Sequence, residues 1–119
     1  MKNILIVDDS LTNLLLLQNI LEEEGYHVLK TTNVKDSIKI INANKIDLIL
    51  LDIMMPGENG FNLLEQVKCD NNSSNIPIIM VTAKNNKEDR EKAKKLGAID
   101  YVEKPIEIDD IIARIKKVL

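Results

Sequence analysis

The sequence Ile49-Leu50-Leu51-Asp52 places a carboxylate directly after a continuous apolar run, and Met55-Pro56-Gly57 follows closely. A charged group at the tip of an apolar strand is unfavourable unless other groups compensate its charge. The chain offers such groups at the tips of three further apolar runs, namely Asp8-Asp9, Thr82 and Lys104. We therefore expect a fold that gathers these strand ends.

Apolar runs of strand length alternate with amphipathic helical segments along the chain. Strands are predicted at Ile4–Val7, Val28–Thr31, Ile46–Leu51, Ile76–Val81 and Ile99–Val102. Helices are predicted at Leu11–Glu24, Val34–Ala43, Phe61–Lys68, Lys87–Leu96 and Ile108–Leu119, the last with Ile108, Ile111, Ile112 and Ile115 on its apolar face. Several apolar runs are continuous, which is typical of strands covered on both faces. The alternation predicts an α/β fold with a parallel sheet and right-handed crossovers.

The composition indicates one soluble globular domain over residues 1–119. Of these residues, 45% are hydrophobic and 29% are charged, with a net charge of -3, and the length suits a single domain. The mild acidity and the 3% aromatic content argue against direct nucleic-acid binding. No apolar stretch approaches the roughly 20 residues of a membrane span. Met1-Lys2-Asn3 leads directly into a strand without a signal peptide, and the single Cys69 excludes an internal disulfide, so a cytoplasmic location is expected.

Polar side chains of complementary chemistry fall at one predicted edge of the sheet. Ligands of open parallel sheets bind outside the carboxyl ends of the strands, and the sequence places Asp8, Asp9, Asp52, Thr82 and Lys104 at such ends. Each has an ordinary alternative. The two adjacent aspartates could complement a helix N-terminus, Asp52 could cap the following loop, the threonine could be a strand residue and the lysine a surface residue. Because they share one edge, a functional site is the preferred interpretation.

These residues have the chemistry needed to accept a phosphoryl group. A carboxylate such as Asp52 can attack phosphorus and hold the group as an acyl phosphate. Phosphoryl transfer depends mainly on positioning and charge neutralisation. Mg²⁺ prefers a few carboxylates, waters and phosphate oxygens, and Asp8, Asp9 and Asp52 provide the carboxylates. Lys104 can pair with one phosphoryl oxygen as a point charge, and Thr82 can donate a hydrogen bond to another.

Taken together, the motifs resemble the receiver domain of two-component response regulators over essentially the whole chain. The matching segments, in order and at the family's spacing, are Ile6-Val7-Asp8-Asp9, Leu50-Leu51-Asp52-Ile53-Met54-Met55-Pro56-Gly57 with Gly60, Val81-Thr82-Ala83, Tyr101 and Lys104-Pro105. The resemblance implies a flavodoxin-like (βα)5 three-layer sandwich with the parallel strand order 2-1-3-4-5.

The resemblance also implies a ligand set for the metal. Asp52 would be the phosphoacceptor. Asp9, Asp52 and the backbone carbonyl oxygen of Met54 would bind Mg²⁺ directly, with Mn²⁺ as a substitute. Asp8 would act mainly through metal-bound water.

The same resemblance assigns phosphoryl binding and switching to Thr82, Ala83, Lys104 and Tyr101. Lys104 would bind the phosphoryl group, and its peptide bond to Pro105 would be cis. Thr82 would move toward a phosphoryl oxygen, and Tyr101 would turn inward to fill the space left behind. The alternative for Tyr101 is a half-buried aromatic ring with its hydroxyl in water.

Two residues are expected to tune the lifetime of the phosphoryl group: Met54, two residues after Asp52, and Lys84, two residues after Thr82. Met54 offers no hydrogen bond to an attacking water, so hydrolysis is not expected to be fast. An aspartate-nucleophile phosphatase would need an acid at this position to protonate the leaving group. The protein is therefore expected to be a phosphoacceptor with slow autodephosphorylation and not a turnover enzyme.

The expected partner is a histidine kinase or a histidine phosphotransfer protein that supplies the phosphoryl group. Leu16 lies away from the apolar stripe of the first helix, and it is either part of a docking patch for this donor or a single exposed leucine. A homodimer through the fourth helix, fifth strand and fifth helix is also expected. The 119 residues hold no effector domain, so the chain either acts alone by contact or is excised from a longer protein, such as a hybrid histidine kinase or a diguanylate cyclase. An interaction module that no longer accepts phosphate would typically lack an acidic or lysine position, and none is missing here.

Overall fold

The computed structural model describes residues 1–55, 57–84 and 86–119. Within these ranges the main sheet consists of β1 (Asn3–Val7), β2 (His27–Thr31), β3 (Leu48–Leu51), β6 (Ile78–Thr82) and β7 (Asp100–Glu103). The strands are ordered β2-β1-β3-β6-β7, and every neighbouring pair is parallel. The predicted order 2-1-3-4-5 is confirmed, because β6 and β7 are the fourth and fifth strands of this sheet.

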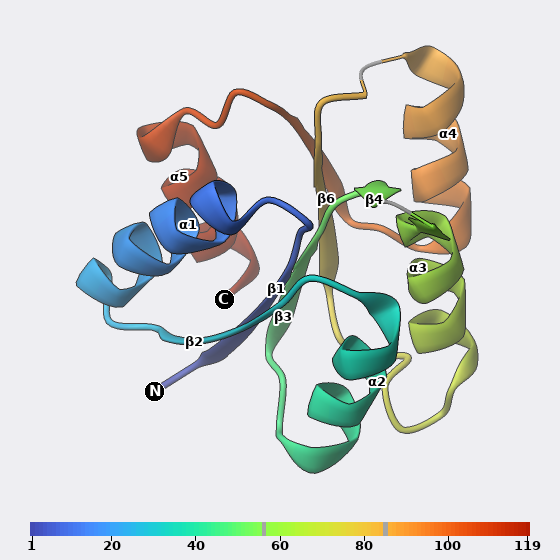
Figure 1. Cartoon of the computed structure of the whole chain (residues 1–119), viewed down its shortest axis with the longest axis horizontal. Helices are drawn as coiled ribbons and strands as arrows, with labels where there is room; N and C mark the ends of the chain where they lie inside the picture. Colours follow the sequence, from blue (N-terminus) through green and yellow to red (C-terminus); the bar gives the residue numbers. More distant parts are fainter. Residues whose placement is uncertain (56, 85) are drawn as a thin grey trace.

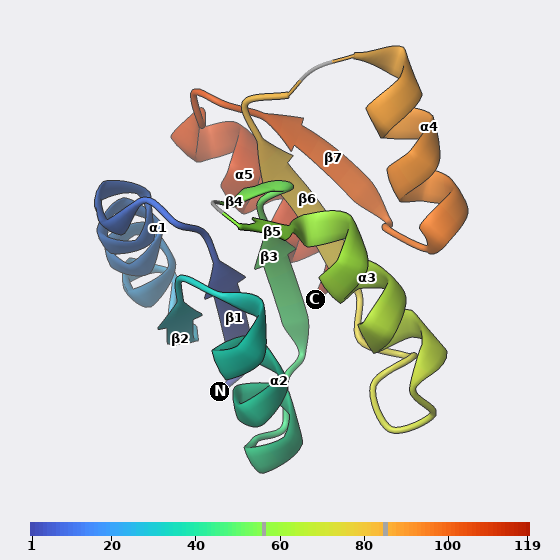
Figure 2. The same ribbon diagram turned by 45° about the vertical axis from the view of Figure 1, so that its right-hand side comes forward.

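Helices cover both faces of the sheet and make the predicted three-layer sandwich (Figure 1). One face carries α1 (Leu11–Glu23) and α5 (Ile108–Val118), and the other carries α2 (Val34–Ala43), α3 (Gly60–Cys69) and α4 (Lys87–Leu96). Figure 2 shows the strands of the sheet pointing toward one edge, at which the loops to the following helices lie. No helix in the described ranges is long and apolar enough to cross a membrane.

The core consists of two apolar layers, because alternate residues of each strand point to opposite faces of the sheet. In β1, Ile4 and Ile6 pack in the layer beneath α1 and α5, whereas Leu5 and Val7 pack in the layer beneath α3. Burial on both faces explains why these strands read as continuous apolar runs. Each buried aliphatic side chain contributes about 1.5–3 kcal/mol of transfer free energy, so the sheet is a firm support for its edge.

The strand boundaries differ from the predicted ones by one or two residues. β3 and β6 begin two residues later than predicted, because Ile46 and Ile76 do not take part in the strand pairing. Ile46 is buried even though it lies before the strand.

The prediction that Ile108 faces the core is wrong. Its side chain is 48% exposed because it is the first residue of α5, and the fully buried positions of this helix are Ile111 and Ile115.

A short hairpin follows β3, and the sequence did not predict it. Its strands are β4 (Met54–Met55) and β5 (Glu58–Asn59), which pair in the antiparallel sense. Gly57 lies in the turn with a φ of 71°, a left-handed conformation that favours glycine. Pro56, part of the motif quoted above, lies outside the described residues.

Gly60 allows α3 to begin directly against the end of β3. Its N–H donates to the carbonyl oxygen of Ile53 at 2.9 Å. A Cβ atom at this position would overlap the carbonyl oxygen of Asp52 and lie 2.8 Å from the Cα atom of Ile53. Both contacts are with backbone atoms, which cannot rotate away, so this close approach requires glycine. The backbone of Asp52 is therefore packed against the start of α3.

Candidate functional site

The sheet register brings the predicted polar residues to one edge. Asp8 directly follows β1, Asp52 directly follows β3, Thr82 ends β6 and Lys104 directly follows β7. Parallel pairing continues one residue past the strands, since the Asp52 N–H donates to the carbonyl oxygen of Val7 at 3.0 Å and the Lys104 N–H donates to that of Thr82 at 2.9 Å. The backbone thereby fixes the points from which these side chains start.

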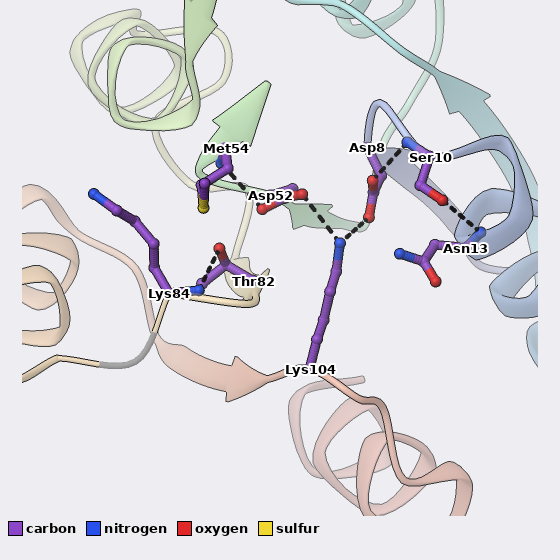
Figure 3. A network of polar contacts seen from close by, with 8 residues as sticks. All are labelled: Asp8, Ser10, Asn13, Asp52, Met54, Thr82, Lys84 and Lys104. Atoms are coloured by element: carbon purple, nitrogen blue, oxygen red, sulfur yellow. Dashed lines mark hydrogen bonds and ion pairs between the residues drawn. The ribbon is translucent and has the colours of Figure 1, made fainter. Parts of the chain in front are cut away.

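One ammonium group joins two buried carboxylates at this edge (Figure 3). The Lys104 Nζ atom lies 2.7 Å from Oδ2 of Asp8 and 3.0 Å from Oδ2 of Asp52. Asp8 is 2% exposed and Asp52 is 4% exposed, so both carboxylates are removed from bulk water. Burial lowers the pKa of Lys104, but the hydrogen bonds to Asp8 and Asp52 outweigh it and raise this pKa above its ordinary value. The lysine therefore stays protonated at neutral pH.

The carboxylates also form a cluster suited to a divalent cation. One oxygen from each of Asp8, Asp9 and Asp52 lies within 4.8 Å of the others, and Asp9 is exposed to solvent. Carboxylate oxygens are the ligands that Mg²⁺ takes, completed by waters and phosphate oxygens. The residues present therefore fit a magnesium ion, and they can hold one with an open side toward solvent.

Local backbone contacts orient the two buried carboxylates. Oδ1 of Asp8 accepts the Ser10 N–H at 2.9 Å, and Ser10 is the N-cap of α1, where its hydroxyl accepts the Asn13 N–H at 3.3 Å. Oδ1 of Asp52 accepts the Met54 N–H at 3.1 Å, so the backbone of Met54 lies beside the cluster. Ser10 was not predicted to be this N-cap, although a serine before an apolar helix is a recognisable N-cap signal.

Thr82 and Tyr101 lie on the adjacent strands β6 and β7, where Tyr101 is opposite Met80, and both are buried. Thr82 is fully buried, and its hydroxyl oxygen accepts the Lys84 N–H at 3.3 Å. Tyr101 is 8% exposed, and its hydroxyl donates to the carbonyl oxygen of Lys84 at 2.6 Å. The guanidinium of Arg90 lies over the ring, 4.7 Å from its centroid. Tyr101 is thus turned inward, and its hydroxyl donates to the protein backbone.

Burial raises the pKa of Tyr101 above its ordinary value, and the charge of Asp89 adds to this shift. Both effects disfavour the phenolate, because a buried anion near another anion is destabilised. The hydroxyl therefore remains a hydrogen-bond donor throughout the physiological pH range.

Met54 and Lys84 border a groove beside the cluster. The groove has a volume of about 410 Å³ and is lined by Ile53, Met54, Met55, Glu58, Asn59 and Lys84. The Met54 side chain is 52% exposed. The Lys84 ammonium pairs with Asp89 on α4 at 3.4 Å, and Figure 3 shows this side chain extending away from Asp52.

The peptide bond between Lys104 and Pro105 is cis.

The fold and the acidic strand ends define a phosphoacceptor class of α/β signalling domain, and comparison with known proteins agrees. The family model described as "Response regulator receiver domain" matches residues 4–116. The chain therefore belongs to the receiver domains of response regulators, which have a phosphoacceptor role in two-component signalling.

Similar proteins differ in how much of their length the chain spans. Protein PilH of Pseudomonas aeruginosa is 41% identical over 119 residues, covering 100% of this chain and 98% of PilH. The phosphate regulon transcriptional regulatory protein PhoB of the same species is 40% identical over 118 residues, covering 99% of this chain but only 52% of PhoB. A crystal structure of a two-component response regulator from Clostridium difficile has a TM-score of 0.93 at 30% identity, covering 99% of this chain and 95% of that one.

Proposed function

We propose that Asp52 is the phosphoacceptor of this receiver domain. The observation that carries the proposal is the shared ammonium group of Lys104, which holds Asp52 and Asp8 together in a buried cluster next to the exposed Asp9. An Asp52 oxygen would form the new P–O bond while the bond between phosphorus and the donor atom breaks, and the donor nitrogen or oxygen keeps the electron pair.

The acidic cluster supports a magnesium site with the ligands expected from the sequence. Asp9, Asp52 and the Met54 carbonyl oxygen would hold Mg²⁺, or Mn²⁺ in its place, and Asp8 would act through water. When bound, the ion would neutralise charge on the equatorial phosphoryl oxygens. Lys104, already within hydrogen-bond distance of Asp52, would then pair with a phosphoryl oxygen attached to the same carboxylate.

We propose that Thr82, Ala83 and Tyr101 convert phosphorylation into a conformational response. Thr82 would rotate its hydroxyl toward the phosphoryl group, and the Ala83 N–H would donate to it. The buried, inward ring of Tyr101 and its hydrogen bond to the carbonyl oxygen of Lys84, two residues after Thr82, support this role. A conformation in which Tyr101 is already inward resembles the one that phosphorylation would favour.

The phosphodonor would be a histidine kinase or a histidine phosphotransfer protein that docks on α1. Leu11, Leu15 and Leu16 of this helix are 67%, 54% and 42% exposed, so the apolar surface extends beyond the single Leu16 that the sequence suggested. Leu11 lies three residues from Asp8, at the end of α1 nearest the cluster. An exposed apolar helix face suits packing against a helical partner.

The proposed dimer face is formed by α4, β7 and α5. Ile99 is 50% exposed there, and it lines a groove of about 320 Å³ together with residues of α4. Arg114 of α5 pairs with Asp100 at 2.7 Å and with Asp110 at 2.9 Å, so this face carries both charge and an apolar residue.

We further propose that residues 1–119 form one domain that is located in the cytoplasm. This domain would bind no nucleic acid directly and would not turn over substrate.

Incubation with acetyl phosphate and Mg²⁺, followed by intact-mass measurement, tests Asp52. The wild-type protein should gain one phosphoryl group, and Asp52→Ala should gain none. Asp109→Ala, which removes an exposed carboxylate from the first turn of α5, should behave as the wild type. Equal labelling of Asp52→Ala, or no labelling of the wild type, would contradict the proposal.

A further inference from the structure

Glu58 reaches from the β4–β5 hairpin to the N-terminus of α2. Its Oε2 accepts the N–H of Val34, the first residue of α2, at 2.7 Å. The N-cap Asn33 does not serve this amide, because its side chain accepts from Asp36 instead, at 2.8 Å. The first N–H groups of a helix lack partners within the helix. A carboxylate there gains from both the charged hydrogen bond and the helix dipole.

The backbone of Glu58 belongs to the segment that carries Met54. Glu58 pairs with Met55 and Asn59 pairs with Met54 across the hairpin. The Met54 N–H in turn donates to Asp52. The contact between Glu58 and Val34 therefore attaches the loop after Asp52 to α2.

The loop before α2 is attached to the other side of the acidic cluster. The Asp8 N–H donates to the carbonyl oxygen of Thr31 at 3.1 Å, and the Asn33 N–H donates to the Thr31 hydroxyl oxygen at 3.4 Å. The two loops that supply the carboxylates are thus joined twice. Lys104 joins the carboxylates of Asp8 and Asp52 directly. Glu58 lies outside the cluster and joins the hairpin after Asp52 to the start of α2.

We propose that Glu58 is a positioning residue for the metal site, acting through the Val34 amide to hold the Met54 backbone at the separation from Asp8 that a bound cation requires. At this edge the Lys104 ammonium contacts the oxygens of Asp8 and Asp52, so it does not itself fix the position of the Met54 backbone. The proposal rests on the metal and phosphoacceptor site proposed above. Outer partners of metal ligands typically change metal affinity about 10- to 100-fold when removed.

Three variants separate the hydrogen bond of Glu58 from its charge. Val34→Pro removes the donor and leaves the carboxylate. Proline is favoured at the first position of a helix, and Asn33 already has the extended backbone (φ -147°, ψ 161°) that a residue before proline prefers. Glu58→Gln keeps an oxygen acceptor without the charge, and Glu58→Ala removes both. Glu65→Ala is the matched control, because it removes one exposed carboxylate from α3.

A titration with Mg²⁺, followed by backbone amide resonances, measures the effect without any phosphorylation. The dissociation constant should rise about tenfold in Glu58→Ala and in Val34→Pro, less in Glu58→Gln and not at all in Glu65→Ala. Combining Glu58→Ala with Val34→Pro should add little, because both break the same contact. The labelling rate with acetyl phosphate should return to the wild-type rate at saturating Mg²⁺, since the variants retain every ligand.

The outcomes distinguish this proposal from the proposed function. Wild-type affinity in Val34→Pro would overturn it, because Glu58 would then act only through its charge. Unchanged affinity in Glu58→Ala would overturn it as well, while leaving Asp52 as the phosphoacceptor. A wild-type protein that binds no Mg²⁺ would overturn both this proposal and the metal site on which it rests.

Discussion

Asp8 and Asp52, at the ends of neighbouring strands, share the ammonium group of Lys104 as their counter-ion. Among the described residues, these two buried carboxylates are neutralised by the same lysine. Lys104→Met should destabilise the fold by about 3 kcal/mol, because it leaves both charges buried without their partner. Urea unfolding measures this change, and Lys95→Met, an exposed lysine of α4, is the control. Added Mg²⁺ should raise the stability of Lys104→Met more than that of the wild type.

The same lysine predicts a pH dependence of stability. The raised pKa of Lys104 means that the folded state holds this proton more tightly than the unfolded state does. Its contribution is therefore complete below the ordinary value of 10.5 and is lost as the pH rises through the higher folded-state pKa. The free energy of unfolding can be measured between pH 9 and pH 12, which spans about 1.5 units on either side of that ordinary value. Over this range it should fall more steeply for the wild type than for Lys104→Met. Parallel curves would contradict this assignment.

Tyr101→Phe should cost about 1 kcal/mol of stability, because the Lys84 carbonyl oxygen loses the donor that it has in the folded protein. The ring and its contact with Arg90 remain in this variant. Tyr26→Phe, on the opposite face of the sheet, controls for removing a hydroxyl in general. Thermal unfolding of the three proteins side by side is sufficient, and an equal loss in both variants would show that the Lys84 contact is not special.

Gly60→Ala should destabilise the protein by about 3 kcal/mol, at the upper end of overpacking effects. The added Cβ meets backbone atoms of Asp52 and Ile53, which can move only if the end of β3 moves. Asn62→Ala, exposed on the same helix, should be nearly neutral. A small effect at Gly60 would mean that the start of α3 shifts easily.

Met54→Asn should shorten the lifetime of phosphorylated Asp52, because an amide beside the phosphoryl group can orient an attacking water where a thioether cannot. The decay of the phosphorylated species, measured by intact mass after removal of acetyl phosphate, gives the half-life. Leu16→Asn, a comparable polar substitution on α1 away from the groove, should leave it unchanged. An unaltered half-life in Met54→Asn would count against a role for this side chain.

The sequence was sufficient to predict the sheet and its edge, because both depend on strong local signals. Continuous apolar runs identify buried strands, and a polar residue after such a run must lie at the end of a strand. Asp8, Asp52 and Lys104 were therefore predicted to lie together, as the structure shows. Strand starts were wrong by one or two residues because the apolar runs begin before the ladder, as at Ile46, Ile76 and Ile99. Ile108 was wrongly assigned to the core because an apolar side chain at the first residue of a helix can face solvent.

The hairpin and the contact between Glu58 and Val34 could not be predicted in the same way. Strands of two residues are too short to show a periodicity, and an acidic residue in a glycine-containing loop reads as a solvated turn. The partner of Glu58 is 24 residues away in the sequence. Such a pairing depends on how α2 is placed beside the sheet, and no local sequence pattern determines this placement.

The inward position of Tyr101 has a practical consequence for measurement. The chain contains two tyrosines and no tryptophan, and Tyr26 packs in the apolar layer on the opposite face of the sheet from Tyr101. The tyrosine part of the near-ultraviolet signal therefore comes from one ring at the proposed switch and one ring remote from it. The protein carries its own optical reporter, so that a change in the surroundings of Tyr101 on phosphorylation can be followed in unlabelled material, with Tyr26 contributing from the opposite face of the sheet.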